Sequence, residues 1–520
     1  MQYPCGFGVI FHVFKNHFRT ILLWLALTIF MNVRAFGQTV PGVLDNYSGS
    51  SSAWLNPSNI STTFVHDDLG LMSFSLSVDN NFAYLPPRTF WPSLKGLMQE
   101  GGDWAKFQGA QPNKDYYYMY PRDDGRRNAY QAMDAVFPSL MMTFMHNHAV
   151  GFSIKARAYT SVTKMPWEIP ILITESTEYD SIQGMPFVSE GMRFANMEWG
   201  EANLSYSTTV LDMGDLKLDA GVTGKFLMAM TGASININEL DYQLLDKDIL
   251  SFHRLDAEAS MALPLSYSAQ FRDLDSFLQL SDPLFKGRGA GADIGFSLTY
   301  KRNSMIRSTH RSACDDAPLR YYWRIGASLI DFGGVRFAKN VMSGRLVGDD
   351  FLVNLSDFDH VTSIGETVEL LDELVGSTTP SIVESDAVFI GLPTALSVQF
   401  DANVWGDFYC NASWIQPVSR WFYGRAVERE PMLSLTPRFE TSFVGAMLPV
   451  TLYNYSYVTA GAFVRVGPLT LGTNDLISLM GLGRTRNIDF MLSIRLKLDR
   501  GDCLFDPIYD ACGTRYRRRK

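Results

Sequence analysis

Apolar and polar residues alternate strictly from Met72 to Asp79, where Met, Phe, Leu and Val take turns with three Ser and one Asp. A period of two places Met72 and Val78 on one face of a strand, and Ser73 and Asp79 on the other. The same alternation recurs, segment after segment, as far as Leu498. The pattern therefore predicts a chain built mostly from strands that have one apolar and one polar face.

Further alternating segments cover residues 150–158, 216–226, 294–301, 323–329, 444–452 and 490–498. Many of their apolar rows run for five residues, which matches the roughly 10-residue strands that cross a bilayer obliquely. We count about 12 to 16 such segments and predict 14 strands, because single-chain membrane barrels favour even numbers. Between the segments, residues 146–148 and 331–334 are interpreted as turns.

Two folds accommodate such strands. In a soluble sandwich the polar face meets water, whereas in a membrane barrel it lines a lumen and the apolar face meets lipid. The strands span more than 400 residues without a linker or a change of composition, and a sandwich is usually complete in far fewer. No repeat of about 20 to 50 residues is visible, which argues against a propeller. The pattern favours one closed, antiparallel transmembrane β-barrel.

The amino-terminal residues are typical of an export signal. Lys15 and Arg19 precede an apolar run of 11 residues, 21–31, and small residues at 35 and 37 predict cleavage before Gln38. The run is shorter than the roughly 20 residues of a spanning helix, so a membrane anchor is the weaker interpretation. No later stretch reaches 18 uninterrupted apolar residues, which leaves a barrel as the means of crossing a membrane.

These observations predict a signal peptide at 1–37, an amino-terminal segment at 38–66, a barrel at 67–498 and a basic tail at 499–520. We expect the mature chain to lie in the bacterial outer membrane, in contact with its lipid. The tail is interpreted as a solvated end, with acidic lipid or a periplasmic partner as the alternatives. Long intervals at 100–130 and 342–385 are interpreted as outer loops, the second with a short amphipathic helix around 366–375.

Charge and cysteine content narrow the picture further. The mature chain keeps 42 basic and 54 acidic side chains, a net charge of −12, which argues against nucleic acid as a partner. It also keeps four cysteines, of which Cys503 and Cys512 are candidates for a disulfide, although the sequence alone does not determine the pairing.

No enzyme motif is present. The sequence lacks a nucleophile elbow, a phosphate loop and a zinc-protease motif, and the glycines between 287 and 295 miss the dinucleotide spacing. His146 and His148 are interpreted as a polar hairpin tip rather than as metal ligands. We therefore expect no catalytic residues, no metal and no cofactor.

Charged side chains on the polar faces are predicted to point into the lumen. Either they form a salt-bridged interior that plugs the barrel, or they line a substrate path. The candidate lumen or ligand residues are Lys155, Arg157, Lys225, Asp293, Arg324, Arg465 and Arg495, together with Asn56 and Pro57 before the first strand.

The segment 53–60, Ala-Trp-Leu-Asn-Pro-Ser-Asn-Ile, resembles the Asn-Pro-Ala element that opens outer-membrane barrels similar to the long-chain fatty-acid transporters, including barrel components of the type IX secretion system. Ser58 stands where Ala is usual. The segments 326–337, 391–399 and 467–473 look like an uncharacterised family of Bacteroidota outer-membrane barrels. One departure is that the last alternating residue is Leu498, where such barrels commonly end on an aromatic residue.

The resemblance implies an amino-terminal hatch that folds into the lumen within residues 38–66. It also implies passage or uptake of a small hydrophobic ligand, and with it a ligand-sized apolar pocket beside the hatch. The alternative is a structural or assembly platform that binds a periplasmic or surface protein of a secretion or surface-attachment system. The family has no assigned catalytic residues to carry over.

Overall fold

The computed structural model describes residues 41–84, 87–88, 118–119, 125–144, 147–174, 182–246, 248–270, 283–302, 321–376 and 381–497. The predicted signal peptide, the Cys503 and Cys512 pair and the basic tail lie outside these residues. The strands are β1 (Asp67–Asn80), β2 (Ala83–Tyr84), β3 (Tyr118–Met119), β4 (Arg127–Phe144), β5 (His148–Met165), β6 (Pro186–Met213), β7 (Leu216–Asp246), β8 (Ile249–Ala262), β9 (Gly287–Lys301), β10 (Tyr321–Phe337), β11 (Val341–Asn354), β12 (Ile382–Glu384), β13 (Val388–Gly391), β14 (Ala395–Trp405), β15 (Phe408–Pro417), β16 (Met432–Glu440), β17 (Val444–Met447), β18 (Val450–Tyr453), β19 (Tyr457–Ala460), β20 (Ala462–Val466), β21 (Leu469–Thr473) and β22 (Asn487–Lys497).

The helices are short. The α-helices are α5 (Glu168–Thr174), α7 (Ile364–Leu374), α8 (Ser419–Phe422) and α9 (Leu476–Leu479), and the 3-10 helices are η1 (Pro41–Val43), η2 (Gly49–Trp54), η3 (Pro57–Ser61) and η6 (Leu355–His360). Among the described residues, no helix has both the length and the apolar character needed to cross a lipid bilayer.

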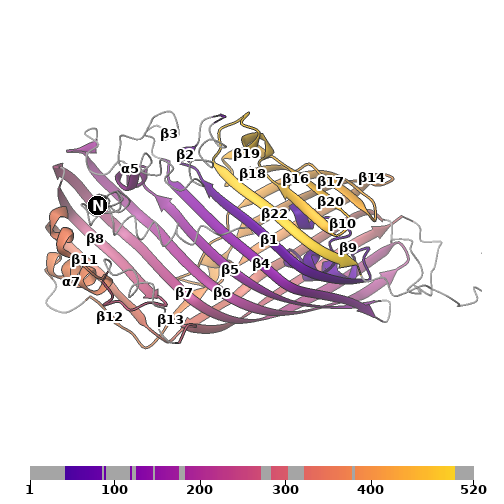
Figure 1. Cartoon of the computed structure of the whole chain (residues 1–520), viewed down its shortest axis with the longest axis horizontal. Helices are drawn as coiled ribbons and strands as arrows, with labels where there is room; N and C mark the ends of the chain where they lie inside the picture. The colour runs from indigo at the N-terminus through magenta and orange to yellow at the C-terminus, as the bar shows by residue number, and fades with distance from the viewer. Residues whose placement is uncertain are drawn as a thin grey trace, which may run out of the picture.

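The wall is one closed antiparallel sheet (Figure 1). Strand β1 closes it by pairing with β4 on one side and with β22 on the other. Some consecutive strands lie end to end against one neighbour, as β8 and β9 do against β7. Counted as single wall strands, these sets are β8 with β9, β10 with β11, β12 with β13 and β14, β17 with β18, and β19 with β20. The described wall therefore has 14 strands, and the predicted fold and strand number are confirmed.

The alternation in β1 has the predicted orientation. Ser73, Ser75 and Ser77 are buried on the lumen side, while Phe74 and Leu76 lie on the other face, partly exposed. Most other wall strands carry large exposed apolar side chains on the outer face, including Phe152, Leu204, Val222, Phe226, Ile294, Phe296, Ile325, Phe400, Leu435 and Leu471. An apolar outer surface around a closed sheet is the surface of a barrel that spans a membrane.

The two ends of the barrel differ. Short connections join β4 to β5, β6 to β7, β14 to β15 and β20 to β21 at one end, which we call the short-turn end. The longer described connections, including those with α5, α7 and α8, lie at the loop end. In bacterial barrels the short turns face the periplasm and the long loops face outwards.

Four strands project beyond the rest at the loop end: β6, β7, β8 and β11. Together they form an extension, which Figure 1 shows beside α7. Strand β7 alone has 31 residues, about 100 Å of extended chain, against the roughly 10 residues that a bilayer requires. The rings of Trp167, Phe187, Tyr242, Phe252 and Phe351 form a continuous row across the extension, with successive centroids 4.9 to 5.9 Å apart. The extension therefore has an apolar core of its own.

Residues 331–334 were predicted to form a turn, and this is wrong. They form an irregularity inside β10, where the pairing with β9 shifts between Leu329 and Phe332. Asp331 and Gly333 have φ angles of 55° and 127°, and a Cβ at Gly333 would lie 2.3 Å from the Ala290 carbonyl oxygen. Positive φ angles therefore mark a bulge in a continuing strand, which sequence alone does not separate from a reversal.

Two predicted loop boundaries are also wrong. The interval 100–130 runs too far, because β4 already begins at Arg127, and residues 100–117 lie outside the described part. The interval 342–385 begins too early, because β11 continues to Asn354 along β8. The predicted helix within it is confirmed as α7, which Ser363 caps through Glu366 N–H.

We expect Ile294→Arg to destabilise the barrel by about 2–4 kcal/mol, because Ile294 faces outwards near the middle of the apolar band. Urea unfolding of the barrel folded into lipid vesicles measures the loss. Leu245→Arg is the matched control, since Leu245 is equally exposed but lies at the tip of the extension, outside the band. Equal losses in both variants would contradict this placement of the membrane.

Candidate functional site

The candidate site is the lumen, which three layers fill. The hatch, residues 41–66, occupies the short-turn end. A layer of ion pairs crosses the middle. The connection from β15 to β16 covers that layer at the loop end, and its residues 424–431 are called the strap.

The hatch is shaped locally by Asn56 and Pro57. The Asn56 side chain accepts a hydrogen bond from Ser58 N–H, and Pro57 begins η3, so the residues of the Asn-Pro element start a helical turn. Asn56 Nδ2 then donates to the Phe296 carbonyl oxygen of β9 at 3.0 Å. A Cβ at Gly295 would lie 2.1 Å from Asn56 Oδ1, so this close approach requires glycine in the wall.

The other side of the hatch is held by charged wall residues. Asp45 pairs with Arg465 of β20 at 2.5 Å, and Asn46 N–H donates to Glu440 of β16 at 3.0 Å. Burial alone would raise the pKa of Asp45, but the Arg465 guanidinium holds that pKa below its usual value. Arg495 of β22 donates to the Ser48 carbonyl oxygen. Buried arginines of the wall therefore fix the hatch through its carboxylate and carbonyl oxygens.

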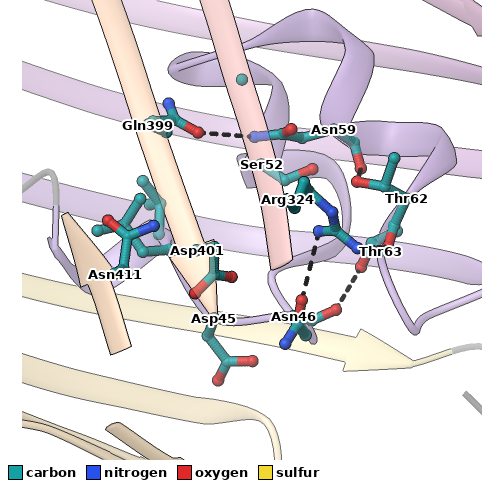
Figure 2. Close-up of a pocket in the computed structure, with 13 residues that line it drawn as sticks. Asp45, Asn46, Ser52, Asn59, Thr62, Thr63, Arg324, Gln399, Asp401 and Asn411 are labelled. Atoms are coloured by element: carbon teal, nitrogen blue, oxygen red, sulfur yellow. Dashed lines mark hydrogen bonds between the residues drawn. The ribbon is translucent and has the colours of Figure 1, made fainter. Parts of the chain in front are cut away.

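Arg324 of β10 joins both arms of the hatch, as Figure 2 shows in part. It donates to Asn46 Oδ1 at 3.4 Å and to the Thr62 carbonyl oxygen at 3.2 Å. Nearby, Asn59 Nδ2 donates to Gln399 Oε1 of β14 at 3.3 Å. Residues 41–65 make no backbone-to-backbone hydrogen bond to the described wall. The hatch has such a bond at its last residue, where Thr143 N–H of β4 donates to the His66 carbonyl oxygen at 3.1 Å, so side chains attach the rest of the hatch.

Asp331 lies at the centre of the ionic layer. Its carboxylate contacts Arg157 Nη1 of β5 at 2.8 Å, Lys225 Nζ of β7 and Arg429 Nη2 of the strap. Lys225 also pairs with Asp293 of β9 at 2.8 Å, and Asp293 accepts the Asp331 backbone N–H at 2.6 Å. All of these side chains are buried.

Arg157 carries the layer across the lumen. Its guanidinium contacts Asp134 of β4 at 2.5 Å and Glu201 of β6 at 3.4 Å, and lies 4.8 Å and 5.0 Å from the ring centroids of Tyr159 and Trp199. Lys155 reaches Glu201 at 3.7 Å and lies 4.9 Å from the ring centroid of Trp54 in the hatch. The hatch and the ionic layer are therefore in contact.

The strap crosses the lumen above this layer. Arg425 and Val427 exchange backbone hydrogen bonds with Gly391 of β13, and Glu428 N–H donates to Ser161 Oγ of β5 at 3.0 Å. Arg429 Nε donates to the Pro393 carbonyl oxygen at 3.0 Å. Because β5 and β13 belong to well-separated wall strands, the strap spans the lumen.

Apolar side chains surround the strap on the lumen side. They form one buried cluster with Val427 at its edge: Ala132, Tyr159, Ala195, Met197, Trp199, Leu227, Ala229, Ala262, Val335, Phe337, Val341, Val388, Ile390 and Leu392. We call this set the lumen cluster. At the end of the strap, burial and the nearby Asp79 carboxylate raise the pKa of Glu430 well above its usual value.

The expected ligand-sized apolar pocket beside the hatch is not found among the described residues. The larger cavity there has a volume of about 30 Å³ and is lined by polar side chains, among them Asn59, Gln399 and Asp401. A second cavity of about 20 Å³ lies beside Trp54 and Lys155. Each is large enough for about one water molecule. Neither of these two cavities is ligand-sized, so the expected pocket stays a prediction.

The structure places every predicted site residue on the lumen side. Lys155, Arg157, Lys225 and Asp293 meet in the ionic layer, whereas the remaining five contact or belong to the hatch: Asn56, Pro57, Arg324, Arg465 and Arg495. Their contact with a ligand stays a prediction. Among the described residues, no group of three or more His, Cys, Asp or Glu side chains is arranged to hold a metal ion.

Sequence reasoning missed Asp331 as the central anion and missed the strap entirely. Asp331 lay inside a stretch interpreted as a turn, and the only local signal was its place before two glycines. The strap reads Gly-Arg-Ala-Val-Glu-Arg-Glu-Pro, a composition that is equally typical of a solvated loop. An excess of buried cations over anions in the predicted lumen set would have indicated a missing carboxylate.

The closed 14-strand wall, its outer apolar rows and its filled lumen define an outer-membrane type of β-barrel. Within that class, the chain belongs to a protein family of unknown function, DUF5723, whose model matches residues 66–474. No curated protein matches the sequence.

Several solved structures are similar to this chain. A Pseudomonas aeruginosa FadL homologue has 12% identity and a TM-score of 0.27, over 89% of this chain and 99% of that one. The monoaromatic hydrocarbon channel CymD has 8% identity and a TM-score of 0.32, over 90% and 98%. The Pseudomonas putida toluene transporter TodX has 9% identity and a TM-score of 0.28, over 89% and 97%. The fold assignment rests on the strand pairing of this chain.

We expect Asp331→Asn to lower the free energy of unfolding by about 3–5 kcal/mol, because it leaves Arg157, Lys225 and Arg429 buried without their shared anion. Urea titration in detergent micelles measures the change. Glu258→Gln is the control, since Glu258 pairs with the partly exposed Arg425 at 3.4 Å and should cost at most about 1 kcal/mol. Similar losses in the two variants would contradict the central role of Asp331.

We expect the strap to loosen as the pH rises. The raised pKa of Glu430 means that closure is fully favoured below the usual carboxyl pKa and weakens as the pH approaches the raised value. Thiol labelling of an Ala426→Cys variant, in a background without other cysteines, should therefore accelerate at high pH. The control variant carries both Ala426→Cys and Glu430→Gln. Thiol ionisation affects the labelling rates of both variants equally, so it cancels in their ratio. A ratio that does not change with pH would contradict the prediction.

Proposed function

We propose that this protein is an outer-membrane barrel that passes a small hydrophobic ligand when the strap and the hatch move. The observation that carries the proposal is the lumen cluster. Water-filled barrels have polar interiors, whereas here Leu227, Phe337 and Ile390 face the lumen in one cluster with Val427 of the strap. Withdrawal of the strap would leave an apolar surface inside the wall, which suits a hydrophobic solute.

The mode of attachment of the hatch supports the proposal. Backbone ladders hold the wall together, but the hatch is fixed by side-chain contacts such as Asp45 with Arg465 and Asn56 with Phe296. Such contacts exchange readily with water, so the hatch can leave while the wall stays closed. In this proposal, the two small cavities beside the hatch belong to the closed state of a gated barrel.

A disulfide between hatch and wall tests this proposal. Ser58 Oγ and Ser297 Oγ lie 2.6 Å apart, so cysteines at the two positions would place their sulfur atoms close together for a cross-link. In cells that carry this variant as their only barrel for the ligand, we expect uptake of a labelled long-chain fatty acid to stop, and to resume after reduction.

The matched control joins two wall positions. Ser434→Cys with Thr451→Cys cross-links β16 to β18, where the two side-chain oxygens lie 3.0 Å apart, and leaves the hatch free. Uptake should continue in this control under oxidising conditions. Undiminished uptake with the hatch locked would refute passage through the lumen.

The extension favours a second candidate function, a platform for a protein partner. Its apolar core projects beyond the membrane band and carries α7. On this alternative, replacing residues 355–381 by a short Gly-Ser linker abolishes partner binding, while locking the hatch has no effect. The opposite pair of results, uptake lost with the locked hatch and kept with the shortened loop, would favour passage.

A further inference from the structure

Two arginines lie side by side on the outer surface of the wall. Arg288 of β9 and Arg336 of β10 are direct partners in the strand register, and both are exposed. Their neighbours Gly287, Val335 and Phe337 are buried on the lumen side, so the alternation directs both arginines outwards.

Neither guanidinium has an ion-pair or hydrogen-bond partner in the part of the chain that the structure describes. Like charges directly opposite each other on one sheet face are destabilising. Exposed arginines of the extension differ, because Arg254 pairs with Glu239 at 2.8 Å and Arg345 with Asp256 at 2.7 Å. Among the described residues, Arg288 and Arg336 therefore have no carboxylate partner, whereas the arginines of the extension do.

The arginine pair stands at one edge of the apolar band. Below Arg288 the outer row of β9 continues with Ala290, Ala292, Ile294, Phe296, Leu298 and Tyr300. The 13 residues from Arg288 to Tyr300 span about 30 Å along the membrane normal at the usual tilt, close to the roughly 25 Å of such a band. Tyr300 stacks on Tyr322 at 5.6 Å, as expected for the aromatic girdle of the opposite edge. Arg288 and Arg336 thus lie at the level of lipid headgroups on the loop side.

Aromatic side chains adjoin the pair on its membrane side. Phe389 is the register partner of Arg336 on β13, and its ring lies 5.7 Å from that of Tyr423. On β10, Phe332 lies two residues before Gly334. Its ring packs against that of Phe422, with centroids 5.2 Å apart. These rings form an apolar ledge, with Phe389 beside Arg336 and Phe332 further towards the middle of the band.

We infer that Arg288 and Arg336 bind the phosphate of a phosphorylated glycolipid in the outer leaflet, whose acyl chains lie along Phe332 and Phe389. Guanidinium groups bind phosphate oxygens in pairs of parallel hydrogen bonds, and one phosphate between two arginines removes their repulsion. The anion source is lipid because the site faces the headgroup layer and continues into the apolar band. The inference needs the barrel's place in the membrane but no passage through the lumen.

The test uses the full barrel purified in a neutral detergent. Native mass spectrometry measures the binding of a diphosphorylated glucosamine-disaccharide lipid and of the same lipid after removal of both phosphates. We expect Arg288→Gln and Arg336→Gln each to weaken binding of the phosphorylated lipid about tenfold, as for the loss of one charged hydrogen-bonding group. Lysine at both positions should recover part of the affinity, because it keeps the charge but not the paired geometry.

The control variant carries Arg254→Gln and Arg345→Gln, which remove the same charge from the extension. It should bind the lipid as the unchanged protein does. Heat-modifiable migration on a gel confirms that every variant is folded. Any of three results would overturn the inference. They are full binding by the variant with glutamine at both 288 and 336, equal binding of the dephosphorylated lipid, and equal affinity for inorganic phosphate alone.

Discussion

The buried carboxylate of Asp331 is the interaction on which the rest of the lumen depends. Three cations from β5, β7 and the strap converge on it, so this side chain of β10 joins other strands of the wall to the segment that crosses the lumen. Burying that many charges is costly unless each one has a partner. The positive φ of Asp331 and the bulge around it turn the carboxylate towards all three cations. A regular strand alternates inwards and outwards, so it could not bury the consecutive residues Ile330 and Asp331 on the same side.

The wall and the segments inside it are held by two kinds of bonding that differ in strength. The wall is a continuous ladder of backbone hydrogen bonds that closes between β1 and β22, and opening it would expose unpaired backbone groups to lipid. The hatch and much of the strap are held by side chains, whose hydrogen bonds can be exchanged for water at little net cost. Movement of the contents inside a rigid wall is therefore the conformational change that this architecture permits most readily.

The sequence predicted what depends on local alternation and missed what depends on distant partners. The serine row of β1 faces the lumen as the period of two requires, and Asn56 with Pro57 begins the hatch helix as their side chains dictate. Asp331 was misplaced because glycines after an acidic residue are as typical of a turn as of a bulge. The strap escaped notice because Glu428 and Arg429 acquire their meaning only from Ser161 and Asp331, which lie far away in sequence. Residues on wall faces are thus predictable, while the identity of their partners is not.

The partners of arginine distinguish three surfaces of the same barrel. In the lumen, Arg157 and Arg438 are buried against carboxylates of the wall, because a buried charge is costly unless it is paired. On the extension, arginines form exposed pairs that add little stability but keep the surface neutral locally. At the edge of the apolar band, Arg288 and Arg336 face each other without an acidic partner among the described residues. A chain with 54 acidic and 45 basic side chains does not lack carboxylates, and we infer that the anion at this level comes from the membrane.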